Sequence, residues 1–167
     1  MSGFPSLKPA FTVRAKIDPG WSVGSASRGT PLTVVPMVGG TVKSEPGFEP
    51  AVDAELHGVG YDYIRGDATG GHLRLDVRSQ LKTKDGELVA MYYKGPMFTS
   101  PAVMRVLTHA EDMKTTEYGD SFMTFEFETG SEKYKELETM VFCAAGHFEI
   151  SGEDTIVEYK VCQVVKG

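Results

Sequence analysis

The 167-residue sequence has little of what marks several common protein classes. It contains two cysteines, one tryptophan, no basic run longer than a pair and no apolar run of membrane length. Two cysteines without CxxC spacing exclude a disulfide framework and a zinc cluster, so we expect buried or half-buried thiols. The net charge of -6 argues against nucleic-acid binding, because a phosphate-binding surface needs clustered Lys and Arg.

Short motifs for metals, cofactors and targeting are also missing. The four histidines form neither HxH nor HExxH, and no GxGxxG, GxxxxGK[ST] or GxSxG occurs; we therefore expect no metal and no cofactor. The first residues, MSGFPSLKPAF, contain no apolar signal-peptide core, and no membrane contact is expected, which predicts a cytoplasmic protein. The length predicts one domain, with residues 1–8 as a flexible arm.

What the sequence does contain is β-type patterning between its nineteen glycines and nine prolines. The clearest segment is 72–82 (HLRLDVRSQLK), where apolar and polar residues alternate, as in a strand with two unlike faces. One helix is expected, capped by Ser100, begun by Pro101 and continued for about three turns through AVMRVLTHAEDM. Residues 131–138 have helical composition for one or two turns. The other expected strands are 11–17, 32–36 with 41–43, 51–57, 59–65, 88–94, 121–128, 139–150 and 155–165.

Eight to ten short strands with one helix predict an all-β, antiparallel fold, and a barrel is favoured over a sandwich. Several strands carry large side chains on both faces, as in 122–127 (FMTFEF), which suits a closed sheet with an aromatic-lined interior. An eight-stranded barrel is about wide enough for one small ligand. Gly39–Gly40 has no helix start beside it, so we interpret it as a bulge where strands approach closely.

Several short elements resemble, in their order and spacing, those of one known family. These elements are Arg28–Gly29, 35–41 (VPMVGGT), 61–63 (YDY), 75–78 (LDVR), 83–86 (TKDG) and 127–130 (FETG) with Tyr134. They resemble the domain-of-unknown-function 3237 family (UPF0311) over about 9–165. The chain departs from the family pattern at Tyr63, where Trp is usual, and at 136–138 (ELE), where Trp-Leu-Asn is usual. This resemblance implies a lipocalin-like, or calycin-like, barrel, and the gene neighbourhoods of members imply small aromatic or polyketide-like substrates.

Asp62 is the leading candidate for chemistry. It stands between Tyr61 and Tyr63, and a carboxylate flanked by aromatic rings is partly desolvated, which raises its pKa and fits it for general acid–base catalysis. The alternative is a turn residue or a hydrogen-bond anchor. Asp76 and Arg78 share one face of their strand. If that face lines the interior, Arg78 anchors a substrate oxygen and Asp76 orients it; otherwise the pair is ordinary surface charge.

These observations predict a β-barrel pocket for a small molecule, with Asp62, Asp76 and Arg78 as catalytic residues. The first hypothesis is a cofactor-independent cyclase, isomerase or lyase acting on an oxygenated, partly aromatic or polyketide-like metabolite. The alternative is a carrier or sensor that binds the same ligand without chemistry, and a third is an interaction module with a filled barrel. Strand edges on an acidic barrel are compatible with a homodimer. The expected substrate-binding residues are Trp21, Arg28, Tyr63, His72, Tyr93, Phe125 and His147.

Overall fold

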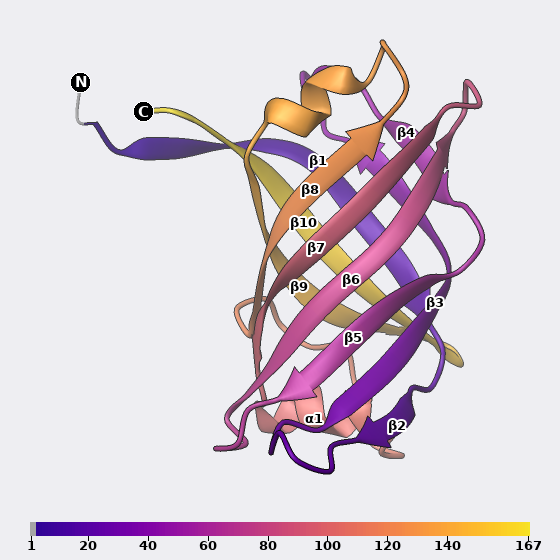
Figure 1. Cartoon of the computed structure of the whole chain (residues 1–167), viewed down its shortest axis with the longest axis vertical. Coiled ribbons are helices and arrows are strands. Elements are labelled where there is room, and N and C mark those ends of the chain that lie inside the picture. The colour runs from indigo at the N-terminus through magenta and orange to yellow at the C-terminus, as the bar shows by residue number, and fades with distance from the viewer. Residues whose placement is uncertain (1–2) are drawn as a thin grey trace.

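The computed structural model describes residues 3–167, and these residues form an antiparallel barrel with one short α-helix (Figure 1). The prediction of an all-β barrel is confirmed. The strands are β1 (Pro5–Ile17), β2 (Trp21–Gly24), β3 (Leu32–Ser44), β4 (Asp53–Leu56), β5 (Gly60–Gly66), β6 (His72–Thr83), β7 (Leu88–Phe98), β8 (Ser121–Thr129), β9 (Phe142–Ser151) and β10 (Asp154–Lys166). The short strands β4 and β5 are separated by only three residues, 57–59.

The sheet closes on itself because β1 pairs with both β10 and β3. From β6 to β10, consecutive strands pair as hairpins or neighbours. β4 and β5 both lie between β3 and β6, one near each end, and together fill one position in the ring. The ring therefore has eight positions, in the order β1, β10, β9, β8, β7, β6, β4/β5 and β3. That number gives an interior that side chains nearly fill.

Period-two alternation decides which side chains enter the barrel. In β6, Leu75, Val77, Ser79 and Leu81 are buried, while the residues that alternate with them are exposed or half-buried, as the sequence pattern predicted. The half of the barrel towards the short 3-10 helix η1 (Lys135–Thr139) is filled by phenylalanine rings whose centroids lie 5.2–6.4 Å from that of Phe11. Those rings are Phe48, Phe125, Phe127 and Phe142.

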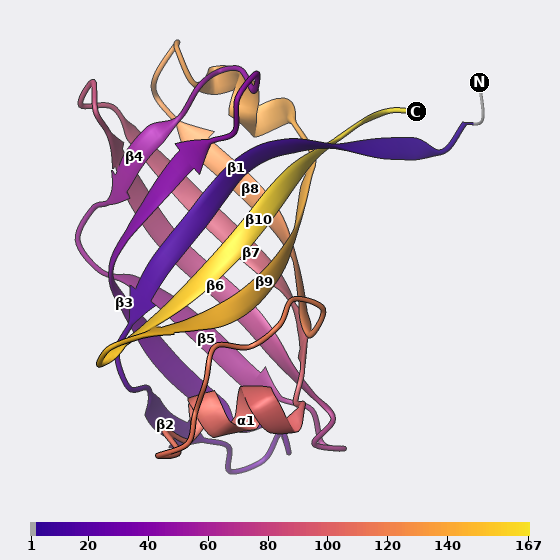
Figure 2. The same cartoon turned by 180° about the vertical axis from the view of Figure 1, so that it is seen from behind.

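Helix α1 (Pro101–Leu107) lies across the opposite end of the barrel (Figure 2). Ser100 caps it by accepting a hydrogen bond from the Val103 amide, as predicted. The helix is shorter than the predicted three turns because the chain leaves helical geometry beyond Leu107. His109 has φ of 51°, a left-handed conformation that ends a helix. The buried faces of Val103 and Val106 fix the helix to the barrel end.

The predicted flexible arm is corrected in part. Residues 5–8 belong to β1 and pair with β10 from Lys166 to Gln163, so they are hydrogen-bonded strand, and residues 1–2 lie outside the described part of the chain. This ribbon extends away from the barrel beside the C-terminus (Figures 1 and 2). No helix within residues 3–167 has the length and apolar character needed to cross a membrane.

The close strand approach predicted at Gly39–Gly40 is present. The register between β1 and β3 shifts at Lys16–Ile17, where the chain faces Gly39 and Met37. A side chain at Gly40 would collide with the backbone carbonyl of Arg14. Glycine at this position lets β1 and β3 come together and close the ring.

Candidate functional site

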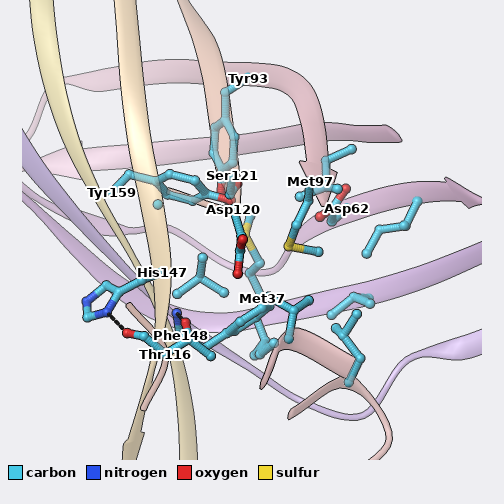
Figure 3. A pocket seen from close by; sticks show the side chains of 18 residues that line it. Met37, Asp62, Tyr93, Met97, Thr116, Asp120, Ser121, His147, Phe148 and Tyr159 are labelled. Atoms are coloured by element: carbon cyan, nitrogen blue, oxygen red, sulfur yellow. Dashed lines mark hydrogen bonds between the residues drawn. The ribbon is translucent and has the colours of Figure 1, made fainter. Parts of the chain in front are cut away.

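A small cavity lies inside the barrel at the α1 end (Figure 3). The cavity has a volume of about 40 Å³, enough for a few water molecules or one small ring. Its wall is mainly aliphatic and aromatic, and β1, β3, β5–β10, α1 and the chain between α1 and β8 all contribute to it. The polar residues on the wall are Asp62, Tyr93, Thr116, Asp120, Ser121, His147 and Tyr159.

Asp62 is the buried acid of this cavity. It points inward from β5 and is 8% exposed. The pKa of Asp62 is raised to about 7, mainly by burial; a hydrogen bond from the Asp76 amide (3.2 Å to Oδ1) opposes the shift, and the nearby charge of Asp76 adds to it. At neutral pH the carboxyl is therefore divided between its acid and its base form, as a general acid–base catalyst requires.

The reason for this burial differs from the one that the sequence pointed to. Tyr61 and Tyr63 alternate with Asp62 along β5 and face the outside, where Tyr63 is 45% exposed and Tyr61 lies 6.3 Å from the Trp21 ring. The residues directly opposite Asp62 on the neighbouring strands are Val35 and Val77. Asp62 is desolvated because the closed barrel places it among aliphatic side chains.

Two buried tyrosines stand near Asp62. Burial raises the pKa of Tyr93 and of Tyr159 well above the usual tyrosine value, and in both cases the charge of Asp62 adds to the rise. The Tyr93 hydroxyl donates a hydrogen bond to the sulfur of Met37 (3.3 Å), and its ring stacks on Phe125 with centroids 4.4 Å apart. Both phenols are neutral at physiological pH and therefore offer O–H groups rather than charge.

Tyr159 fits only because its neighbour is glycine. Gly146 of β9 pairs with Tyr159 of β10 and with Ser121 of β8. A Cβ at Gly146 would collide with the Tyr159 ring. Glycine therefore allows the phenol to lie flat on the β9 backbone and to reach the cavity wall.

Ser121 and Asp120 were missed by sequence reasoning. Ser121 shares the inward face of β8 with Met123 and Phe125, so alternation alone places it inside. Asp120, just before β8, accepts a hydrogen bond from the Ser100 hydroxyl (2.7 Å) and so connects the cap of α1 to the cavity wall. A signal for Ser121 existed in the strand pattern, whereas the position of Asp120 depends on how α1 docks.

The expectation that Asp76 and Arg78 face the interior is wrong. Both are exposed on the outer face of β6, because the inward positions of that strand are held by Leu75 and Val77. The Arg78 guanidinium lies over the Tyr92 ring, 4.6 Å from its centroid, in an outer groove of about 280 Å³. Asp76 still contributes to the site, but through its backbone amide, which donates to Asp62.

Of the predicted substrate-binding residues, Tyr93 and His147 belong to the cavity lining, and Phe125 stacks behind the Tyr93 ring. The His147 ring faces outward: its Nδ1 lies 2.7 Å from the Thr116 carbonyl and the ring stacks on Tyr118, as Figure 3 shows for the Thr116 contact. The remaining predicted residues lie outside the cavity. Trp21, Arg28, Tyr63 and His72 are exposed, with Trp21 at 56% and His72 beside Phe98.

A larger vestibule of about 340 Å³ adjoins the cavity between α1 and the β1–β2 turn. The two spaces share Ile17, Val35, Ile64 and Leu107, so only aliphatic side chains separate them. None of the described residues lining either space is Lys or Arg. Within residues 3–167, no three His, Cys, Asp or Glu side chains gather as a metal site would require. The combined space suits an uncharged molecule with an apolar body.

Solved structures share this fold over their whole length. A conserved protein of unknown function from Rhodopseudomonas palustris has a TM-score of 0.76 at 23% identity, covering 99% of this chain and 100% of that one. A β-barrel-like protein from Acinetobacter baumannii gives 0.69 at 24% identity, with 98% and 97% covered. An enzyme from Penicillium herquei gives 0.62 at 18% identity, with 96% and 94% covered. At these identities the likeness concerns the fold alone.

Among curated proteins, none matches this sequence. A family model described as a protein of unknown function (DUF3237) matches residues 5–164. The match spans nearly the whole chain and agrees with the resemblance carried by the short sequence elements. The chain therefore belongs to the DUF3237 family.

Proposed function

We propose that the protein is a cofactor-independent enzyme that isomerises, cyclises or dehydrates a small, neutral, oxygenated metabolite. One observation carries the proposal: Asp62 is a carboxyl with a pKa of about 7, enclosed by an apolar wall in a cavity that adjoins a larger vestibule. Perturbed carboxyls in clefts are characteristic of acid–base sites. A protein from Penicillium herquei that has the same fold is described as an enzyme, which is compatible with the proposal.

The chemistry proposed for Asp62 balances without a co-reactant. The protonated carboxyl gives its proton to an oxygen of the substrate as the C–O bond to that oxygen breaks, or as a C=O group becomes C–OH. The resulting carboxylate then takes a proton from another position of the same substrate, which restores the acid. The net result is an isomer, or the substrate less one water. Positioned proton transfer of this kind contributes about 10²–10⁴-fold to the rate, and the apolar wall adds by fixing the reactive conformation.

The nature of the lining limits the substrate class. The cavity wall carries Asp62 and Asp120, the vestibule wall carries Asp18, and none of the described residues on either wall is Lys or Arg, so a carboxylate or phosphate substrate has no Lys or Arg counter-charge there. Burying an unpaired charge is strongly unfavourable. The largely apolar vestibule and the aromatic inner wall accommodate a flat or branched carbon skeleton, such as a small aromatic or polyketide-like molecule.

The test compares the wild-type protein with Asp62→Asn in a metabolite extract followed by untargeted mass spectrometry. For an enzyme, one compound is depleted by the wild-type protein, and a product of equal mass or of mass lower by one water accumulates; Asp62→Asn gives no product but still binds the compound. The matched control is Arg78→Gln, which removes the outward-facing cation and should retain full turnover. If wild type and Asp62→Asn both bind the compound and neither makes product, the protein is a carrier or sensor.

A further inference from the structure

The hydroxyl of Ser121 has no hydrogen-bond partner although it is buried. Among residues 3–167, its Oγ is the one buried side-chain nitrogen or oxygen left unpaired, and Ser121 is 5% exposed. The Tyr159 hydroxyl is the nearby polar group. Contact with Ser121 lowers the pKa of Tyr159 against the larger, opposite effect of burial, but the two hydroxyls do not meet the geometry of an ordinary hydrogen bond. Buried polar groups in folded proteins are nearly always paired, so an unpaired one needs an explanation.

The position of Ser121 relative to Asp62 supplies that explanation. β8 is three positions from β5 around the ring by way of β6 and β7, and β10 is three positions from β5 by way of β3 and β1. In a ring of eight, strands three positions apart face each other across the interior. Ser121 and Tyr159 therefore stand across the cavity from Asp62, and all three residues line it (Figure 3).

The rest of the inward face of β8 shows that a polar residue is not needed for packing. Met123, Phe125 and Phe127 occupy the following inward positions, and all are apolar. An alanine at position 121 would leave no unpaired hydroxyl and would be more favourable in the empty barrel. By contrast, Ser79, another buried inward serine, donates a hydrogen bond to the Met91 carbonyl (2.9 Å) and so has a structural partner.

We propose that Ser121 is a ligand-binding residue: its hydroxyl binds an oxygen of the ligand across the cavity from Asp62. The ligand class is a neutral molecule that carries a hydroxyl or carbonyl oxygen on a small ring or short apolar group. A hydroxyl both donates and accepts hydrogen bonds, so either kind of oxygen completes the Ser121 pairing. This inference rests on the proposed function because it places the ligand in the same cavity, and it adds the group that orients the ligand.

The experiment uses two probes of nearly equal shape, phenol and toluene, which differ in one hydroxyl, with benzoate as the charged counterpart. Binding is measured by NMR titration of the wild-type protein, Ser121→Ala and the matched control Ser79→Ala, and the free energy of unfolding is measured for each by urea denaturation. The wild-type protein should bind phenol more tightly than toluene, and benzoate most weakly, because no described Lys or Arg lines the cavity.

In Ser121→Ala, the preference for phenol over toluene should fall two- to tenfold, the value of one net hydrogen bond at 25 °C. The same variant should be at least as stable as the wild-type protein, since it loses an unpaired hydroxyl. Ser79→Ala should be less stable and keep the phenol preference. That combination separates a ligand-binding hydroxyl from one held by the protein or by a buried water.

Three results overturn the inference. If Ser121→Ala keeps the phenol preference, the role of Ser121 is refuted and the proposed role of Asp62 is unaffected. The same conclusion follows if Ser121→Ala loses as much stability as Ser79→Ala. If neither phenol nor toluene binds the wild-type protein, the cavity takes no small ligand. In that case this inference and the proposed function both fail.

Discussion

Replacing Asp62 with asparagine should change how the stability of the protein depends on pH. Asp62 has an ordinary unfolded-state pKa of 3.8 and a folded-state pKa of about 7, because burial disfavours the charged form. Between these values the folded protein holds a proton that the unfolded chain has released. Stability therefore falls as pH rises through this range, and the penalty is complete above pH 7. Asparagine carries no charge and escapes the penalty.

The magnitude follows from the difference of about three pH units, at 1.36 kcal/mol each. Through this one carboxyl, the free energy of unfolding of the wild-type protein should fall by about 4 kcal/mol between pH 4 and pH 8. The free energy of unfolding of Asp62→Asn should therefore rise relative to that of the wild-type protein by about 1.4 kcal/mol per pH unit over the steepest part of the range. The side chain is 8% exposed, so solvent screening removes little of this effect.

The assay is urea denaturation of both proteins at several values of pH from 4 to 8.5. A control with the opposite sign is Asp67→Asn, because hydrogen bonds from Arg74 (2.7 and 3.0 Å) lower the pKa of Asp67. Its loss should weaken the protein by an amount that stays nearly constant across this range, because the lowered pKa of Asp67 lies below pH 4. A pH-independent difference between Asp62→Asn and the wild-type protein would refute the assignment of Asp62 as a buried, desolvated acid.

Two further predictions concern the β9–β10 pair. Gly146→Ala should lower the free energy of unfolding by about 1–3 kcal/mol, because the added methyl group collides with the Tyr159 ring. The control is Gly39→Ala, where a Cβ meets open space, and its free energy of unfolding should be unchanged. Equal urea midpoints for the two variants would contradict the packing argument. Cys143 and Cys162 are directly paired, half-buried free thiols, so dibromobimane should join them within one chain, as intact-mass measurement would show; separate monoadducts on both thiols would contradict the pairing.

Much of the fold was predictable from the sequence because strand alternation is a local property. The apolar set of β6 lies inside the barrel as its period predicted, and the cap at Ser100 begins α1 where expected. The end of that helix was not predictable, because the left-handed His109 reflects how the following chain packs over the barrel end. The strand β2 was missed for a similar reason: three of its four residues are exposed, and its pairing with β3, not a buried face, defines the strand.

The candidate site was predicted less completely, and the misses share one cause. Local sequence shows which residues share a face but not which face is inside, so Asp76 and Arg78 were assigned to the interior together with Asp62. The orientation of each strand relative to the core decides this. The larger apolar side chains of β6 face the barrel interior, so its charged side chains face the solvent. Tyr159 and Ser121 come from strands distant in sequence, and only ring closure brings them near Asp62.

The amino-acid sequence by itself determined the all-β class, most strand positions and the single α-helix, and it singled out Asp62 as a candidate. These follow from periodicity, turn residues and a carboxyl between two tyrosines, all of which act over a few residues. The tertiary structure alone decided that Asp62 is desolvated, that Arg78 is not, and that an unpaired Ser121 faces the same cavity. Burial and pairing across a closed barrel depend on contacts between segments far apart in the chain, which no local pattern encodes.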